Sequence, residues 1–184
     1  MRIGILTVSD RAFRGEREDR GGPALASWLK DRGEEEVVFG LVPDEAEAIA
    51  AVLRRWADEA RCDLVLTTGG TGLAPRDVTP EATVGVCQRL IPGLAEAMRH
   101  ASRKKTPTAS LSRAVAGIRG QTLIVNLPGS PAGALENLAA IWPAVPHAVA
   151  KIQGDASDCA PDTGGRLPYG ERRTAECPTR NFEG

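Results

Sequence analysis

The fold is decided by the stretch from Asp63 to Thr83, which reads DLVLTTGGTGLAPRDVTPEAT. Its first six residues predict a short strand around the apolar run Leu64-Val65-Leu66, which is typical of a strand covered on both faces. Three glycines follow within four residues, and then Thr79-Pro80-Glu81. That triplet is a strong helix start, because threonine caps, proline suits the first turn and an acid favours the positive end of the helix dipole. The stretch therefore predicts a buried strand, a glycine-rich loop and a helix.

The same alternation of strand and helix extends along most of the chain. Residues 112–118 fit either a helix or a strand, and the turn-like residues 119–121 favour a hairpin with the strand that follows. We expect a polar loop over residues 10–20. Strands are predicted at 2–9, 36–42, 63–68 and 121–127, and helices at 21–32, 44–60, from 79, at 92–103, 132–142 and 146–153. Such alternation predicts an α/β fold, a three-layer α/β/α sandwich with a mostly parallel sheet.

The totals restrict the class of protein. A chain of 184 residues suits one domain, here residues 1–154, and the composition beyond them predicts a C-terminal tail at 155–184. A net charge of −1 without a basic stripe argues against a nucleic-acid partner. The four cysteines are far apart, which fits free thiols in a reducing cytoplasm. We expect no membrane span, since no apolar run approaches about 18 residues, and no signal peptide.

Four loops are expected to meet at one edge of the sheet. Right-handed crossovers place every strand-to-helix loop on the same side, and ligands bind outside the carboxyl ends of the strands. The loops are 9–11, 43–45, 69–77 and 126–131. This edge is the predicted site.

The glycine loop, Gly69-Gly70-Thr71-Gly72, has two interpretations. Glycines let backbone N–H groups turn toward an anion, so the loop suits phosphate, with hydroxyls added by Thr67, Thr68 and Thr71. Alternatively it is a plain tight turn. It matches neither the Walker A motif nor the dinucleotide fingerprint.

Asp44 and Asp77 also have two interpretations. Asp44, with Glu47 three residues on, fits a capping box, and Asp77 is close enough to Thr79 to satisfy backbone donors at a helix start. If the glycine loop binds a polyphosphate, however, bare carboxylates oppose it, since like charges at about 4 Å repel by roughly 4 kcal/mol at an effective dielectric of about 20. A Mg²⁺ ion bound between an acid and a phosphate turns this repulsion into attraction. Either both acids are caps, or both hold a metal on a phosphate substrate.

The remaining candidates come from the other loops. Ser9 and Asp10 either form a strand-end turn or face the crevice. Residues 126–131 are either a simple strand exit or a second anion site, and 110–113 either connect elements or add donors. The two histidines, His100 and His147, are isolated and fit ordinary surface or core positions.

With these residues identified, the chain resembles the MoaB/Mog family of molybdenum cofactor biosynthesis proteins, and within it the molybdopterin adenylyltransferases. The long block at 67–83 is the specific feature, and the other motifs are shorter. They are RIGILTVSDRA (2–12), DRGGPAL (19–25), VPDE (42–45), TTGGTGLAPRDVTPEAT (67–83), LSRAVAGIRG (111–120) and NLPGSP (126–131).

The resemblance implies adenylyl transfer from MgATP to the terminal phosphate of molybdopterin, with release of pyrophosphate. It implies a homotrimer, or a hexamer in the MoaB branch, and a molybdenum-insertion protein as a later partner. The family's two essential aspartates fall on Asp44 and Asp77, as catalytic residues and Mg²⁺ ligands. The other implied binding residues are Ser9, Asp10, Thr68, Gly69, Gly70, Thr71, Gly72, Ser112, Asn126, Pro128, Gly129 and Ser130. The alternative is a MoaB-like binding or scaffold protein without transfer activity.

Overall fold

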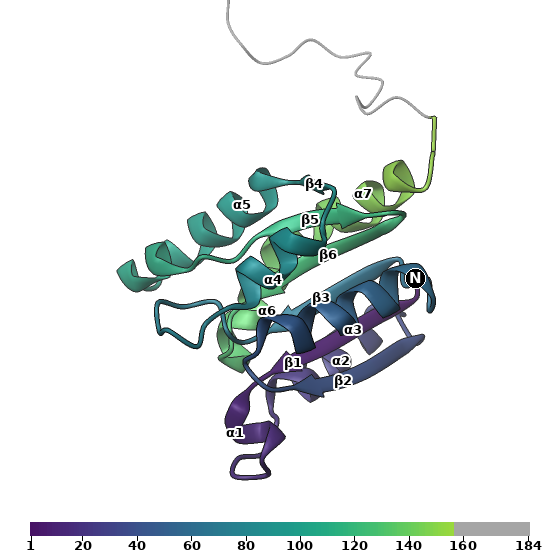
Figure 1. Ribbon diagram of the computed structural model, residues 1–184. Coiled ribbons are helices and arrows are strands. Elements are labelled where there is room, and N and C mark those ends of the chain that lie inside the picture. Colours follow the sequence, from purple (N-terminus) through teal and green to yellow (C-terminus); the bar gives the residue numbers. More distant parts are fainter. Residues whose placement is uncertain (157–184) are drawn as a thin grey trace, which may run out of the picture.

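The computed structural model describes residues 1–156, and all but the first two residues of the predicted tail lie outside them. A six-stranded sheet with the order β2-β1-β3-β6-β5-β4 runs through the molecule (Figure 1). Its strands are β1 (Ile3–Val8), β2 (Val37–Val42), β3 (Leu64–Thr68), β4 (Arg89–Leu90), β5 (Ala116–Arg119) and β6 (Thr122–Leu127). The four strands predicted from the sequence are confirmed.

The four longer strands are parallel and end almost in one row. Thr7 pairs with Thr68, which in turn pairs with Leu127, and Val8 pairs with Val42. The residue that follows each strand therefore lies beside the residue that follows its neighbour. This register brings the four loops of the predicted site to a common edge.

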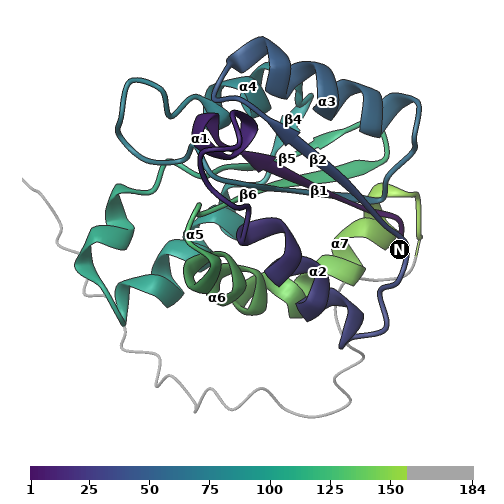
Figure 2. The same ribbon diagram turned by 90° about the horizontal axis from the view of Figure 1, so that it is seen from below.

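Helices cover both faces of the sheet, which confirms the three-layer architecture. In Figure 2 the sheet is seen nearly on edge, with α3 and α4 on one side and the other four long helices on the opposite side. The first pair is α3 (Ala46–Asp58) and α4 (Thr79–Val86); the second set is α2 (Gly21–Lys30), α5 (Pro92–Arg103), α6 (Pro131–Ile141) and α7 (Val145–Ile152). Each layer encloses its own cluster of buried apolar side chains.

The three tryptophans pack in these layers. Trp56 is 5% exposed and lies over the sheet at Gly4, where an added Cβ would come within 2.5 Å of its ring. Trp28 and Trp142 meet edge to face on the other side, with 5.3 Å between ring centroids. Removing the Trp56 ring would leave a cavity against the sheet, which costs about 3–5 kcal/mol for a buried tryptophan.

The hairpin favoured by the turn-like residues is confirmed. β5 and β6 are antiparallel, and the loop between them is two residues long. Gly120 adopts φ +55, the positive value that such a short loop requires. β4 adds an antiparallel edge strand that the sequence did not predict.

Three short helices were also not predicted. They are α1 (Asp10–Phe13), η1 (Pro107–Leu111) and η2 (Trp142–Ala144). The expectation of a loop throughout residues 10–20 is therefore wrong at its start, because the Ser9 hydroxyl accepts a hydrogen bond from the Ala12 amide at 3.2 Å and caps one helical turn. Within residues 1–156, every helix is too short or too polar to cross a membrane.

Candidate active site

A cavity of about 370 Å³ opens at the edge where the parallel strands end. All four predicted loops contribute to it. Eight of the predicted residues line it: Ser9, Asp44, Thr68, Gly69, Gly70, Asp77, Gly129 and Ser130. The N-terminal ends of α2 and α6 also border this cavity, through Gly21 and Pro131. Two helix N-termini place positive dipole ends beside it, which favours a bound anion.

The glycine loop passes close to other backbone. Gly69 has φ +106, and a Cβ on it would lie 2.2 Å from the carbonyl oxygen of Val8. Gly70 has φ +63, and a Cβ there would lie 2.3 Å from Thr79 Oγ1. Thr79 ties the loop to α4, since its hydroxyl donates to the Gly69 carbonyl at 2.9 Å and its amide to the Gly70 carbonyl at 3.1 Å. Glycine is thus required at both positions.

The Gly69 and Gly70 carbonyls of this loop accept hydrogen bonds from Thr79, but three of the loop's backbone amides have no acceptor within residues 1–156. Among residues 1–156, no oxygen accepts a hydrogen bond from the backbone amides of Gly70, Thr71 or Gly72. Consecutive free N–H groups are what a phosphate-binding loop supplies. A loop that only reversed the chain would not need three neighbouring amides without acceptors. The geometry therefore favours the phosphate interpretation.

Asp44 does not cap α3, and the capping-box alternative is wrong. The N-cap of α3 is Glu45, without a side-chain capping bond. Asp44 Oδ2 instead accepts a hydrogen bond from the Asp10 amide at 2.7 Å, while no donor in the described chain reaches Oδ1. Burial raises the pKa of Asp44, and the charges of Asp10 and Asp77 add to the effect. One carboxylate oxygen therefore remains available at the cavity.

Asp77 does not cap α4 either. The N-cap of that helix is Val78, again without a side-chain bond. Asp77 Oδ2 accepts from the Ala74 amide at 2.8 Å and so closes a turn within the loop. No donor within residues 1–156 reaches its Oδ1. The two acids thus lie on either side of the glycine loop, Asp44 beside Gly70 and Asp77 beside Gly72.

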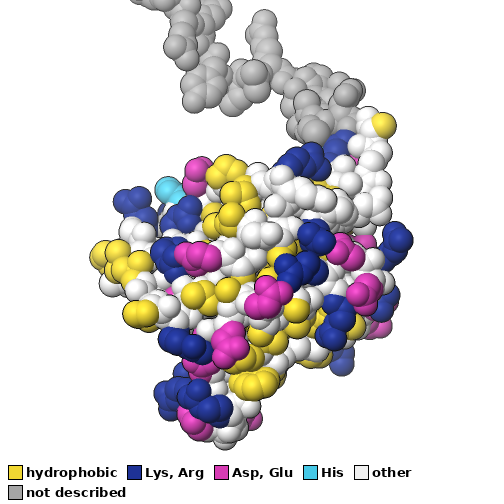
Figure 3. Space-filling model, viewed as in Figure 1, with side chains coloured by type: hydrophobic (Ala, Val, Ile, Leu, Met, Phe, Trp, Pro, Cys, Tyr) yellow, Lys and Arg dark blue, Asp and Glu magenta, His cyan; other side chains and the backbone are white. Residues whose placement is uncertain are grey.

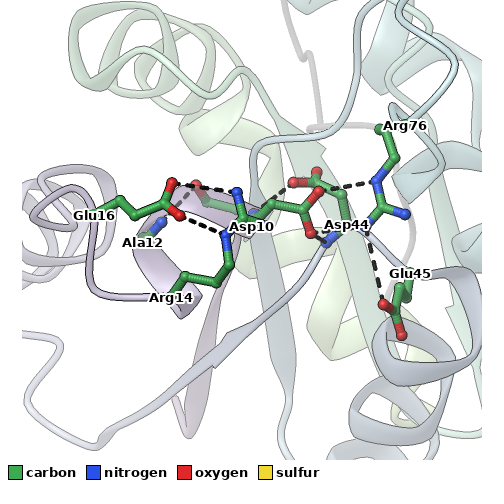
Figure 4. A network of polar contacts seen from close by, with 8 residues as sticks. Asp10, Ala12, Arg14, Glu16, Asp44, Glu45 and Arg76 are labelled. Atoms are coloured by element: carbon green, nitrogen blue, oxygen red, sulfur yellow. Dashed lines mark hydrogen bonds and ion pairs between the residues drawn. The ribbon is translucent and has the colours of Figure 1, made fainter.

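Asp10 is engaged within the protein and does not line the cavity. Its Oδ1 accepts from the Asp44 amide at 3.0 Å and from Arg76 Nη2 at 2.8 Å, and its Oδ2 accepts from Arg76 Nε at 2.9 Å (Figure 4). Both oxygens of the Asp10 carboxylate thus have donors within the protein, and the binding role of Asp10 stays a prediction.

A second cavity, of about 440 Å³, lies on the other side of the glycine loop. It contains the predicted residues Thr71, Gly72, Ser112 and Pro128. Its lining is more apolar, with Leu73 and Leu111, and Ser130 borders both cavities. The sequence-predicted residues thus form two groups that meet at Ser130.

Asn126 lines neither cavity, and its role as a binding residue stays a prediction. Its side chain is fully buried, and its Nδ2 donates to the hydroxyls of Thr67 at 3.0 Å and Thr83 at 2.8 Å. The amide of Val115 donates to its Oδ1 at 3.3 Å. Asn126 therefore links β6, β3, α4 and the segment before β5. Thr68 has a mixed role, since it lines the first cavity but its hydroxyl donates to the Pro128 carbonyl at 2.8 Å.

The residues of the first cavity that sequence reasoning missed include four charged ones, Arg17, Glu18, Asp19 and Arg20. Asp19 accepts hydrogen bonds from the Thr7 hydroxyl at 2.7 Å and from the Gly21 amide at 2.9 Å. An acid just before a helix start is a recognisable signal, and it could have identified Asp19. The two arginines lie in an irregular loop, where no periodicity places them.

Arg113 supports the glycine loop from outside. Its amide donates to the Thr71 carbonyl at 3.0 Å, and its Nε donates to the Gly72 carbonyl at 2.7 Å. Its Nη2 donates to the carbonyl of Asp77. The guanidinium therefore fixes the loop to Asp77 rather than facing a ligand.

The charges around the first cavity favour a divalent cation. Four acids and two arginines line it. Among residues 1–156, no three His, Cys, Asp or Glu side chains are grouped closely enough to hold a metal by themselves. Mg²⁺ commonly takes one or two carboxylates and completes its shell with substrate phosphates and water. Asp44 and Asp77, each with one oxygen available, fit a site of that kind.

Comparisons with known proteins show the family of this chain. Residues 4–147 match the family model described as "Probable molybdopterin binding domain". A curated relative from Helicobacter pylori, named molybdopterin adenylyltransferase, is 48% identical over 155 residues, covering 83% of this chain and 88% of that protein. The Escherichia coli protein of the same name is 43% identical over 176 residues, covering 88% and 90%.

Solved structures agree with the sequence matches. The molybdopterin biosynthesis enzyme MoaB of Thermus thermophilus is 55% identical and superposes with a TM-score of 0.77, covering 83% of this chain and 96% of that one. The family model spans most of the chain, and the curated relatives are matched over nearly their whole length. The chain therefore belongs to the MoaB/Mog family of molybdopterin-binding proteins, which acts in molybdenum cofactor biosynthesis.

Proposed function

We propose that this protein is a molybdopterin adenylyltransferase. An oxygen of the terminal phosphate of molybdopterin forms a bond to the α-phosphorus of ATP. The bond between that phosphorus and the bridging oxygen breaks, and pyrophosphate leaves. The products are adenylylated molybdopterin and pyrophosphate, so the atoms balance without a further reactant.

One observation carries the proposal. Asp44 and Asp77 line the same cavity as the glycine loop, neither caps its helix, and each keeps one carboxylate oxygen without a donor among residues 1–156. A pure phosphate-binding pocket has no use for two carboxylates, because they repel the ligand. They become useful when a cation lies between them and the phosphates. The curated relatives named molybdopterin adenylyltransferase point to the same reaction.

Each group at the cavity then has a role. The free amides of the glycine loop are oriented donors for phosphate oxygens. The N-termini of α2 and α6 add dipole ends at the cavity, although their Gly21, Gly22 and Gly133 amides donate to Asp19 and Ser130. Arg17 and Arg20 place positive charge at the same cavity. Asp44 and Asp77 would hold Mg²⁺, which when bound neutralises charge on the phosphates and the leaving pyrophosphate. The protein groups themselves act by alignment and by electrostatic stabilisation.

The second cavity fits the pterin. Its apolar walls at Leu73 and Leu111 suit a flat ring system, and Ser112 and Ser130 offer hydroxyls. Ser130 borders both cavities, which places the two substrates on either side of one residue. Neither cavity is lined by His or Cys within the described residues, so direct transfer without a covalent enzyme intermediate is the simplest course.

A binding or scaffold function is the second candidate, because the resemblance to the MoaB branch leaves it open. The Thermus thermophilus structure, which is 55% identical, is named MoaB, whereas the transferase relatives are 48% and 43% identical. Calorimetry separates the candidates. A scaffold binds molybdopterin but not ATP with magnesium, whereas the transferase binds both.

Assembly and location complete the proposal. Homotrimers in the cytoplasm fit the free thiols of Cys62 and Cys87 and the exposed Phe39 and Leu41 on the edge strand β2. On the face drawn in Figure 3, hydrophobic side chains reach the surface among charged groups. The molar mass in solution, measured by light scattering after size-exclusion chromatography, tests whether the protein is a trimer. A hexamer would favour the MoaB-like alternative. A molybdenum-insertion protein would receive the product.

The reaction is tested directly with purified full-length protein. Molybdopterin, ATP, Mg²⁺ and pyrophosphatase are incubated with it, and adenylylated molybdopterin is measured by chromatography. We expect product only when magnesium is present. Molybdopterin that binds but is recovered unchanged would refute the transferase and support the scaffold.

A further inference from the structure

Asp10 and Arg76 connect three of the four loops that form the active-site cavity. Asp10 begins α1 just after β1, Asp44 follows β2, and Arg76 belongs to the loop between β3 and α4. The Asp10 amide donates to the Asp44 carboxylate at 2.7 Å, and the Asp44 amide donates to the Asp10 carboxylate at 3.0 Å. Arg76 then binds Asp10 through two nitrogens (Figure 4).

The two hydrogen bonds that Asp10 and Asp44 exchange determine which oxygen of the Asp44 carboxylate is free. Oδ2 is fixed by the Asp10 amide, so Oδ1 is left on the side of Gly70, where a glycine Cβ would come within 3.1 Å of it. The bidentate bond from Arg76 fixes the plane of the Asp10 carboxylate, because a planar guanidinium matches a carboxylate in one orientation only. Arg76 thereby fixes the Asp10 carboxylate, which accepts from the Asp44 backbone amide, while the Asp10 backbone amide holds the Asp44 carboxylate.

We propose that Asp10 and Arg76 are positioning residues for the proposed transferase: they hold the Asp44 carboxylate, and the loop that carries Asp77, in the arrangement that receives a magnesium-bound nucleotide. The inference rests on the proposed function. It assigns no contact with substrate to either residue.

The charges around Asp10 and Arg76 agree with this positioning role. Each of the Asp10 and Asp44 carboxylates accepts from the other residue's backbone amide, and the two negative charges repel one another at this range. The hydrogen bond from Arg76 lowers the pKa of Asp10, and the bond from Asp10 raises the pKa of Arg76. Arg14 adds positive charge beside Asp10, and Glu45 lies 3.9 Å from Arg76. Arg76 therefore places a positive charge against the Asp10 carboxylate and offsets its repulsion with Asp44.

A merely structural role predicts a different outcome. The Arg76 side chain is 57% exposed, and exposed ion pairs contribute little to stability. If the pair were only a surface ion pair, its loss would leave both stability and ligand binding nearly unchanged. Residues that orient a metal-binding carboxylate, by contrast, typically change metal affinity or activity by about 10- to 100-fold.

The test measures binding of ATP to the full chain by calorimetry, with and without Mg²⁺, together with the melting temperature. The variants are Asp10→Asn, Arg76→Gln and Arg76→Lys. The matched control is Glu16→Gln, which breaks the similar bidentate pair between Arg14 and Glu16 on the surface near α1. Arg76→Gln serves where Asp10→Asn folds poorly, since it leaves Asp10 unchanged.

We expect Asp10→Asn and Arg76→Gln to weaken magnesium-dependent ATP binding by about 10- to 100-fold, with the melting temperature little changed. Arg76→Lys should fall between wild type and Arg76→Gln, because lysine keeps the charge but loses the fork. Glu16→Gln should bind as wild type does. Wild-type affinity in both Asp10→Asn and Arg76→Gln would overturn the positioning role while leaving the proposed function intact. If the wild type itself shows no magnesium-dependent ATP binding, the proposed function fails instead.

Discussion

Gly70→Ala should separate the requirements of the glycine loop from those of the rest of the fold. Gly70 has φ +63, and an added Cβ would lie 2.3 Å from Thr79 Oγ1 and 3.1 Å from Asp44 Oδ1. The methyl group must therefore displace the threonine hydroxyl that now donates to the Gly69 carbonyl. It would also press on the oxygen of Asp44 that faces the cavity.

The expected loss of stability follows from these contacts. A left-handed conformation costs a residue with a Cβ roughly 1–2 kcal/mol, and loss of the Thr79 hydrogen bond costs about 1 kcal/mol. We therefore expect the free energy of unfolding to fall by about 2–3 kcal/mol. At about 2–4 °C for each kcal/mol in a chain of this size, the melting temperature should fall by roughly 4–12 °C.

Gly85→Ala is the matched control. Gly85 lies in α4, and an added Cβ there meets nothing within 4 Å. Alanine in a helix is favoured over glycine by up to about 1 kcal/mol, so this change should stabilise the protein. Calorimetric melting measures both variants, and titration with MgATP should show weaker binding for Gly70→Ala alone. Equal melting temperatures for the two variants, with equal affinity, would refute the account of the loop.

Three further predictions concern other residues of the site. Asp44→Asn should raise the free energy of unfolding at pH 7, because burial raises the pKa of this carboxyl and its ionised form therefore disfavours folding. In urea denaturation, the stability gained by the variant over wild type should shrink as the pH falls toward the ordinary carboxyl pKa of about 4. A variant less stable than wild type at pH 7 would contradict this. Asn126→Ala should lower the free energy of unfolding by about 3 kcal/mol, because it leaves buried polar partners unsatisfied; a change under about 1 kcal/mol in urea titration would argue against the linking role. Arg20→Ala should weaken MgATP binding by up to about fivefold, the range for exposed charges, and less so at high salt; no change at low salt would exclude Arg20 from the site.

The sequence predicted the framework well because the framework depends on patterns within each segment. Continuous apolar runs gave the four parallel strands, and the Thr79-Pro80 start gave α4. Gly120 in a short turn gave the hairpin. β4 was missed because its two residues, Arg89 and Leu90, are exposed and are paired only through β5. Nothing local in the sequence distinguishes such a segment from a loop.

The candidate site was predicted less completely because its roles depend on contacts across the chain. Asp10, Asp44 and Asn126 are all polar residues near strand ends, yet Asp44 lines the cavity, Asp10 binds Arg76 from a distant loop and Asn126 is buried between elements. The local capping pattern at Asp44 was misleading, because the Asp10 amide provides a stronger alternative partner. Only the assembled sheet edge determines which of these residues faces a ligand.

The central claim is that Asp44 and Asp77 together enable transfer from magnesium-bound ATP. It is tested most directly by the rate of a single turnover, in which adenylylated molybdopterin is measured with wild type, Asp77→Asn and the control Asp31→Asn at the exposed end of α2. Asparagine can still accept the hydrogen bond from the Ala74 amide, so the loop should stay folded. We expect Asp77→Asn to bind molybdopterin normally but to form product at least about 100-fold more slowly, while Asp31→Asn matches wild type. Equal rates for Asp77→Asn and wild type would contradict the claim.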